Sequence, residues 1–258
     1  NPGDNPWDEI AALGELQVYP RTAVGQVVDR ARDAEVILTN KTPLPEAAIA
    51  ALPRLQYVAV MATGYNIVDV AAARRRGIPV SNVPEYGTEA VAQFVFALLL
   101  THCHHVARHD AAVRAGRWRA SGDFCFWETP LVELAGLAMG IVGFGRIGRR
   151  VGQIANALGM TVLACDLEPA APPPWAPFAW TDLQDLFSRS DVVSLHCPQT
   201  AANAGFVDAA LLARMKPSAV LINTARGGLI DAEALASALR HGTLGAAALD
   251  VAPAEPLP

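Results

Sequence analysis

A glycine-rich turn between a predicted strand and a predicted helix constrains this chain most. Residues 143–148 read GFGRIG, a G-x-G-x-x-G pattern. An apolar run over residues 138–144 leads into the turn, a helix is predicted over 146–158, and a second apolar run occupies 161–166. Strand, glycine turn, helix and strand in this order predict a β-α-β unit that binds the pyrophosphate of a dinucleotide. A purely structural turn is the alternative, and this context disfavours it.

Each residue of the turn has a physical role in that prediction. Gly143 permits the tight turn, Gly145 lets the backbone approach the pyrophosphate, and Gly148 lets the helix pack closely on the strand. The helix N-terminus, at Arg146 and Ile147, supplies N–H donors and the positive end of the helix dipole. We therefore expect these five residues to bind a dinucleotide cofactor.

Asp166 predicts which dinucleotide binds. It follows the glycines by about 20 residues, where a carboxylate accepts hydrogen bonds from the adenosine ribose hydroxyls. The same carboxylate repels a 2′-phosphate. NADP sites usually place Arg or Lys just after this position, whereas Leu167 and Glu168 follow here. The sequence therefore favours NAD over NADP.

The alternation of apolar runs and helical stretches predicts two α/β domains in these 258 residues. The alternation runs from residue 16 to residue 82 and resumes at residue 138, and its first expected strand covers residues 16–19. Such an alternation is typical of parallel sheets. Between the two series, residues 88–115 read as one long helix that is apolar on nearly every face. We expect this spine helix to be covered on all sides, between domains or at a subunit contact.

Composition excludes several classes of protein. The net charge of −5 argues against a nucleic-acid partner, and the one basic run, residues 74–76, precedes a glycine where a helix should end. No apolar window has the length of a membrane span, and residues 1–7 do not resemble a signal peptide. The four cysteines are widely spaced, which indicates a reducing, cytoplasmic setting.

A cluster of histidines on the predicted spine helix raises the question of a metal site. His105 and His109 share a helical face, and His102, Cys103 and His104 lie beside them. However, no carboxylate in an H-E-x-x-H arrangement accompanies them. We expect no metal, and prefer packing at a dimer contact.

Six segments in order resemble the NAD-dependent D-2-hydroxyacid dehydrogenases. They are residues 62–66 (ATGYN), 86–92 (YGTEAVA), the glycine turn, 195–200 (LHCPQT), 223–228 (NTARGG), and 249–258 with its terminal EPLP. Within the family, residues 121–127 (SGDFCFW) and the opening NPG are most similar to the glycerate dehydrogenase and hydroxypyruvate reductase branch.

The resemblance implies a fold and a reaction. It implies two doubly wound parallel-sheet domains, a flavodoxin-like substrate domain over residues 1–87 and a Rossmann NAD-binding domain over 88–258, with the active cleft between them. The implied reaction is NADH-dependent reduction of a small 2-keto acid, with hydroxypyruvate or glyoxylate favoured, to the D-2-hydroxy acid. The predicted spine helix adds the expectation of a homodimer. The rival interpretation is an NAD-sensing interaction protein that has kept the cofactor site without turnover.

Arg226 is the expected clamp for the substrate. It follows the end of a predicted strand, where ligands of parallel sheets bind, and small residues flank it. A guanidinium there can hold the carboxylate of a keto acid and stabilise the developing alkoxide. A structural salt bridge is the alternative role. The resemblance adds Thr63 and Gly64, whose backbone N–H groups are expected to bind the substrate carboxylate.

The resemblance also implies a proton donor. In the family, the glutamate that corresponds to Glu255 pairs with a histidine further along the chain and raises its pKa, so that the histidine protonates the alkoxide. The sequence stops at Pro258, before such a histidine, and no strand precedes its opening loop. We therefore expect a fragment or unplaced ends.

The remaining expected cofactor contacts come from the resemblance alone. The loop of His196, Cys197 and Pro198 is expected to line the cofactor, and we prefer this role for His196 over that of the missing acid. Thr224 and Ala225 are expected to approach the nicotinamide ring, and Asp250 to bind its carboxamide.

Overall fold

The computed structural model describes residues 6–255, and the chain divides into two compact units, Asn1–Gly87 and Thr88–Pro258. The opening NPG and the last three residues of EPLP, which contribute to the resemblance, lie outside the described residues. Across the described residues, no single helix is long and apolar enough to cross a membrane; α5 and α6, defined below, pass that test only as a pair bent by 50°.

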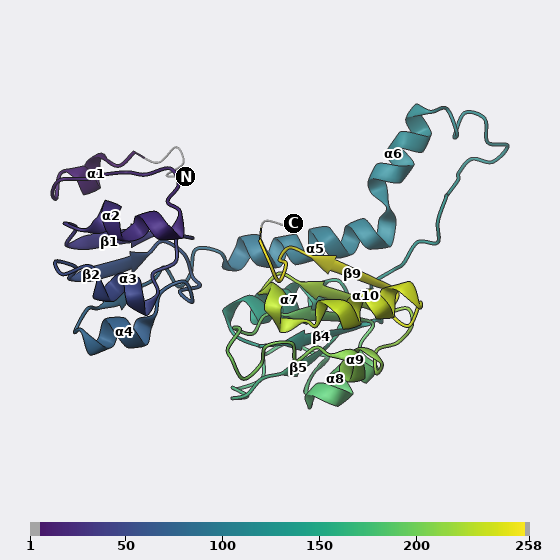
Figure 1. Cartoon of the computed structure of the whole chain (residues 1–258). Helices are drawn as coiled ribbons and strands as arrows, with labels where there is room; N and C mark the ends of the chain where they lie inside the picture. Colours follow the sequence, from purple (N-terminus) through teal and green to yellow (C-terminus); the bar gives the residue numbers. More distant parts are fainter. Residues whose placement is uncertain (1–5, 256–258) are drawn as a thin grey trace. The chain divides into compact units, whose positions relative to one another are not determined.

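The first unit is built on a three-stranded parallel sheet in the order β1-β2-β3 (Figure 1). The strands are β1 Val36–Thr39, β2 Tyr57–Val60 and β3 Val80–Ser81. The helices are α1 Asp8–Ala11, α2 Val27–Ala31, α3 Glu46–Ala50 and α4 Val70–Arg75, with a 3-10 turn at Val24–Gln26. Val58 and Val60 are buried against Ile49 and Ala73 from the helices α3 and α4. The parallel α/β organisation is thus confirmed here.

The prediction of a strand over residues 16–19 is wrong. The segment is assigned to no strand, and Val18 and Tyr19 are 44% and 42% exposed. Tyr19 packs its ring under the Arg30 guanidinium, 4.6 Å from its centroid, and donates its hydroxyl to Gln17. The apolar side chains therefore have surface contacts rather than a place in the described sheet.

The second unit contains a six-stranded parallel sheet in the order β6-β5-β4-β7-β8-β9. The strands are β4 Ala138–Val142, β5 Thr161–Cys165, β6 Phe178–Trp180, β7 Val192–Leu195, β8 Val220–Asn223 and β9 Ala246–Leu249. The first strand in sequence, β4, lies in the middle, and the order reverses between it and β7. This is the Rossmann arrangement, which places a ligand at the carboxyl ends of the strands on either side of the reversal.

Helices cover both faces of this sheet. The helices of this unit are α5 Thr88–His104, α6 Val106–Arg114, α7 Arg146–Ala157, α8 Leu183–Arg189, α9 Ala209–Leu212 and α10 Ala232–Arg240, with a 3-10 turn at Gly227–Leu229. One core joins α5 and α7 to the sheet through residues such as Leu99, Val151 and Ile141. A second core packs the helices α8, α9 and α10 against the opposite face of the sheet. The doubly wound prediction is confirmed.

The spine helix expected over residues 88–115 is broken into two. His105 adopts a left-handed conformation, with φ of 46°, and the axis bends by 50° between α5 and α6. Such a conformation interrupts the helical hydrogen-bond ladder. α5 buries one stripe rather than all faces; its buried residues are Ala92, Val95, Phe96, Leu99 and Cys103. α6 leads away from the sheet (Figure 1).

Strand β6, which the sequence did not predict, belongs to an aromatic cluster at the edge of the sheet. The rings of Phe178 and Trp180 lie 5.1 and 5.4 Å from Phe144, and Trp175 lies 5.6 Å from Phe178. Phe144 is itself part of the glycine turn and only 3% exposed. The cluster therefore anchors that turn to the sheet.

Candidate active site

The predicted site residues of the second unit meet because five strands end in register. Val142 pairs with Cys165 and Leu195, Leu195 pairs with Asn223, and Asn223 pairs with Leu249. The residue that follows each of these strand ends is one that the sequence singled out: Gly143, Asp166, His196, Thr224 and Asp250. The structure thus brings these five positions together at one edge of the sheet.

The three glycines of the turn differ in what surrounds them. Gly143 has φ of 89°, and a Cβ there would lie 2.5 Å from the backbone nitrogen of Cys197. A Cβ on Gly148 would lie 2.1 Å from the carbonyl oxygen of Gly143. At Gly145, by contrast, a Cβ would meet nothing within 4 Å. Two glycines therefore permit packing, and the third leaves space in front of the helix N-terminus at Arg146 and Ile147.

Asp166 faces this turn. Its Oδ2 accepts a hydrogen bond of 2.6 Å from the backbone nitrogen of Phe144, and its Oδ1 lies 3.4 Å from the backbone nitrogen of Glu168. Leu167 between them is fully exposed. The open face at Gly145, the helix N-terminus and the carboxylate fit the pyrophosphate and adenosine ribose of a dinucleotide.

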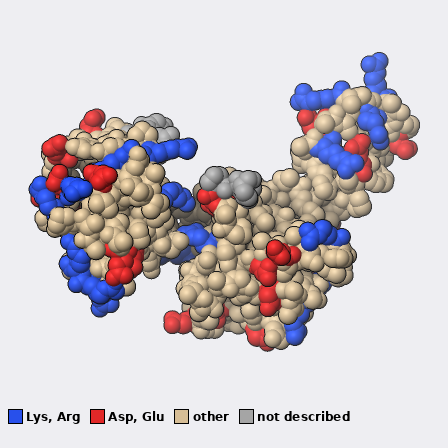
Figure 2. Space-filling view, in the orientation of Figure 1, with Lys and Arg blue, Asp and Glu red and all other residues tan. Residues whose placement is uncertain are grey.

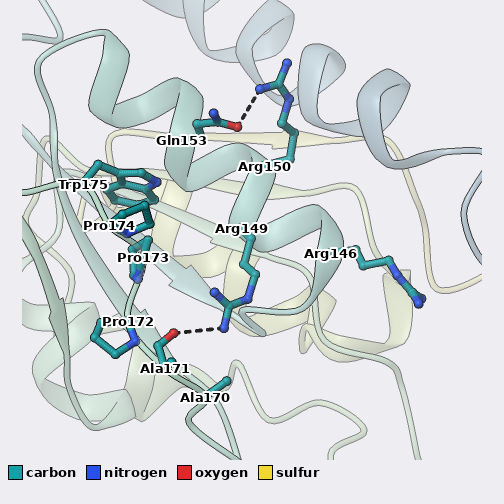
Figure 3. Close-up of a pocket in the computed structure, with 10 residues that line it drawn as sticks. All are labelled: Arg146, Arg149, Arg150, Gln153, Ala170, Ala171, Pro172, Pro173, Pro174 and Trp175. Carbon is teal, nitrogen blue, oxygen red and sulfur yellow. Dashed lines mark hydrogen bonds between the residues drawn. The ribbon is translucent and has the colours of Figure 1, made fainter.

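A hollow of about 590 Å³ lies beside the turn, between α7 and the proline-rich loop at residues 170–175 (Figure 3). Arg146, Arg149 and Arg150 line it but point in different directions. Arg149 reaches the Ala171 carbonyl at 3.3 Å, and Arg150 binds Gln153 and Glu89, each at 2.7 Å. The three guanidinium groups do not converge on one ligand.

The loop after β7 is held by its own polar groups. His196 Nε2 lies 2.9 Å from the hydroxyl of the buried Ser194, and burial lowers the pKa of His196 to about 4. The imidazole is therefore neutral near pH 7, which suits a lining role better than acid catalysis. Burial also raises the pKa of the Cys197 thiol to about 11, and Pro198 accepts a hydrogen bond from Asn203.

Arg226 follows β8 on a short turn. Its backbone is extended, its Nη1 donates to the Ala225 carbonyl at 2.7 Å, and its side chain is partly buried. Asn223 forms two side-chain hydrogen bonds to this turn. Sequence reasoning missed Asn223; the available signal was an asparagine that ends an apolar strand three residues before the arginine.

The turn of Arg226 contacts the loop that carries Glu255. A Cβ on Gly227 would lie 2.0 Å from the carbonyl carbon of Ala252, so this contact requires glycine. Glu255 Oε1 accepts a hydrogen bond of 3.0 Å from the Ala252 nitrogen. The exposed Asp250 donates its backbone N–H to the Asn223 carbonyl. The two expected catalytic residues thus lie on loops that touch.

Two further expected residues lie in the first unit. Thr63 donates its hydroxyl to the Val83 carbonyl at 2.9 Å, and its own carbonyl accepts from Asn82 at 2.8 Å. Gly64 follows it, beyond the end of β2. These bonds tie the 63–64 turn to the segment after β3. As for metals, no group of three or more potential ligands occurs among residues 6–255.

The fold and the site define a dinucleotide-binding dehydrogenase, and comparison with known proteins identifies its family. Residues 96–258 match the family model described as D-isomer specific 2-hydroxyacid dehydrogenase, NAD binding domain. The chain belongs to this family. It is an NAD-dependent D-2-hydroxyacid dehydrogenase.

Individual relatives show the same similarity. A hydroxypyruvate reductase of Blautia hydrogenotrophica is 45% identical over 260 residues, covering 100% of this chain and 81% of the relative. A glycerate dehydrogenase of Methylorubrum extorquens is 39% identical, covering 90% and 71%. The crystal structure of a D-lactate dehydrogenase from Aquifex aeolicus with NAD and lactic acid superimposes with a TM-score of 0.86 at 31% identity, covering 96% of this chain and 73% of the other.

Proposed function

We propose that this protein reduces hydroxypyruvate or glyoxylate with NADH to the corresponding 2-hydroxy acid, and catalyses the reverse oxidation. The observation that carries the proposal is the register of the sheet, which sets the turn of Arg226 at the same edge as the glycine turn. The printed names of the Blautia and Methylorubrum relatives support the substrate class.

Arg226 is the proposed substrate clamp. Its guanidinium binds the carboxylate of the keto acid and polarises the ketone oxygen, so that charge developing on that oxygen is stabilised. The bound nicotinamide supplies the hydride. In this proposal Thr224 and Ala225 line the ring and Asp250 holds its carboxamide, which selects the face that reacts.

A proton must reach the alkoxide to complete the reduction. We assign Glu255 the role of orienting the proton donor and keeping it protonated, since a carboxylate beside a histidine raises the pKa of the histidine. His196 is not that donor, because its pKa of about 4 leaves it unprotonated near pH 7. Residues 1–87 are the proposed substrate domain. In it, Thr63 and Gly64 are the proposed ligands of the substrate carboxylate, through their backbone N–H groups.

NADH is the proposed cofactor in preference to NADPH. Asp166 already directs a carboxylate oxygen at the glycine turn, where it accepts from Phe144 at 2.6 Å. A 2′-phosphate would bring two negative groups together at this position, and Leu167 and Glu168 offer it no cation.

We further propose a cytoplasmic homodimer. α6 and the segment after it expose several large apolar side chains: Val106, Val113, Trp118, Phe124, Trp127 and Leu131. An apolar surface of this extent is typical of a protein contact, and a second copy covers it symmetrically. The four cysteines are all free in the described structure, as in proteins of reducing compartments. Size-exclusion chromatography with light scattering of the full-length protein tests the dimer by measuring its molar mass.

The reaction is tested by following NADH absorbance with the full-length protein. Hydroxypyruvate and glyoxylate should support oxidation of NADH with kcat/KM above that for pyruvate, and NADPH should be the poorer donor. If NADH binds but no short 2-keto acid is reduced, the proposal is wrong and the NAD-sensing interaction protein becomes the better explanation.

A further inference from the structure

Asn223 is a buried polar side chain at the end of β8, fully shielded from solvent. Its Oδ1 accepts from the Ala225 nitrogen at 3.0 Å, and its Nδ2 donates to the Arg226 carbonyl at 2.9 Å. One amide thus bridges two peptide groups of the turn that presents the guanidinium. Its backbone carbonyl is occupied as well, by the Asp250 nitrogen.

The same turn is fixed from its other side. Gly227 lies so close to Ala252 and Pro253 that a Cβ would be 2.5 Å or less from their backbone atoms. The neighbouring Thr224 does not contribute a side-chain bond, because its buried Oγ1 has no hydrogen-bond partner among the described residues. Between the packed glycine and the strand end, the Asn223 amide bonds to the backbone on both sides of Arg226, and the Leu229 nitrogen also donates to the Arg226 carbonyl, at 3.2 Å.

We propose that Asn223 is a positioning residue for keto-acid reduction, and that it acts through Arg226. This inference rests on the proposed role of Arg226 as substrate clamp. Asparagine is required because a short amide carries both a donor and an acceptor. Aspartate keeps the acceptor toward Ala225 but loses the donor toward Arg226, and leucine loses both.

The consequence concerns the substrate more than the cofactor. The glycine turn lies on β4 and α7, two strands away from β8 across β7, so loosening the turn of Arg226 should leave the contacts to the pyrophosphate and adenosine intact. Because Thr224 and Ala225 are the proposed nicotinamide contacts, NADH affinity should fall, but much less than activity. A displacement of the guanidinium by about 1 Å can cost about 100-fold in rate when it must meet both a carboxylate and a developing alkoxide. Asn223 therefore determines how well substrate and transition state are held.

The test compares N223D and N223L with a matched asparagine elsewhere in the same unit. Asn156 also donates its Nδ2 to a main-chain carbonyl, that of Ala176 at 2.8 Å, and N156D removes that bond far along α7. We expect N223D and N223L each to lower kcat/KM for hydroxypyruvate by about 30- to 100-fold, with a much smaller loss of NADH affinity by calorimetry. N156D should leave both unchanged. Binding of oxalate to the NADH complex should weaken in N223D and not in N156D.

A double-mutant cycle with R226A separates positioning from general structural damage. If Asn223 acts through Arg226, N223D should cost little further activity or oxalate affinity in the R226A background. Equal losses in both backgrounds, or a loss of NADH affinity matching the loss of activity, would overturn the inference while leaving the clamp in place. If R226A itself retains activity and oxalate affinity, the proposed function of Arg226 fails and the positioning role fails with it.

Discussion

The glycine turn and the arginine turn lie at the same sheet edge but are built in different ways. The glycine turn is defined by missing side chains: Gly143 and Gly148 allow backbone contacts that no Cβ could enter, and Gly145 leaves open space. The arginine turn also needs a glycine, at Gly227 against Ala252, but a side chain holds it as well, because the buried amide of Asn223 bonds to two of its peptide groups. The first shape is fixed mainly by packing, and the second by packing together with side-chain hydrogen bonds.

This difference teaches which changes each turn should tolerate. A packed turn should fail when an atom is added, and a hydrogen-bonded turn should fail when a polar atom is removed. In the first case stability and cofactor binding should be lost together. In the second, substrate handling should be lost while the cofactor still binds.

R226A should have the largest effect. Removing the proposed clamp should lower kcat/KM for hydroxypyruvate by about 1000-fold, the upper range for loss of one group that stabilises developing charge. R226K should recover only part of this, since an ammonium cannot form the bidentate contact. Steady-state kinetics and calorimetry with NADH measure both; weakened NADH binding in R226A would break the distinction between the two turns.

The next largest effect is expected from the pair G148A and G145A. A Cβ on Gly148 would lie 2.1 Å from the Gly143 oxygen, so G148A should destabilise the fold by about 2 to 3 kcal/mol and abolish NADH binding. G145A places its Cβ in open space and should keep the melting temperature of the unaltered protein while weakening NADH binding. Thermal denaturation distinguishes them, and equal melting temperatures would contradict the packing argument.

D166A should change the choice of cofactor. Loss of the carboxylate should weaken NADH binding by about 30-fold, as expected for hydrogen bonds to a charged group, and remove the repulsion of NADPH. The ratio of kcat/KM with NADH to kcat/KM with NADPH should therefore fall. D182N, which alters an N-cap carboxylate of α8, serves as the control and should leave that ratio as it was.

The smallest effect concerns His196 and pH. Its pKa is lowered from 6.5 to about 4 in the folded protein, so the unfolded chain binds the proton more readily. The associated stability is complete above pH 6.5 and is lost as the pH falls toward 4. The unaltered protein should lose about 1 kcal/mol of unfolding free energy between pH 7 and pH 5.5 from this group, and H196Q should abolish that loss. Urea denaturation at both pH values measures it, and an identical pH dependence in both proteins would rule out this source.

Much of the fold could be predicted because burial and periodicity are local signals. The apolar runs that became β4, β5, β7 and β8 are buried strands, and G-x-G-x-x-G placed the turn correctly between β4 and α7. Strand β6 is three residues long, too short to show a pattern, and its rings pack on Phe144, which is distant in sequence. The run at 16–19 shows the converse, since apolar residues without a neighbouring strand do not form one.

Other features could not be read from single residues. No glycine or proline marks the break at His105, although the His109 ring just beyond it bonds to the His105 carbonyl and to the distant Glu128 nitrogen. The bridging role of Asn223 likewise requires three-dimensional positions, because asparagine at a strand end has many possible partners. The roles assigned to Glu255, Thr224 and Asp250 came from family resemblance and stay predictions.

The aromatic cluster beneath the glycine turn gives the protein an internal optical probe. Trp180 lies 5.4 Å from Phe144, whose backbone nitrogen bonds to Asp166, and Trp175 lines the neighbouring hollow. Indole emission overlaps the absorption of reduced nicotinamide, so energy transfer should quench these tryptophans when NADH binds but much less when NAD⁺ binds. The redox state of the bound cofactor should therefore be visible in the fluorescence of the unlabelled protein.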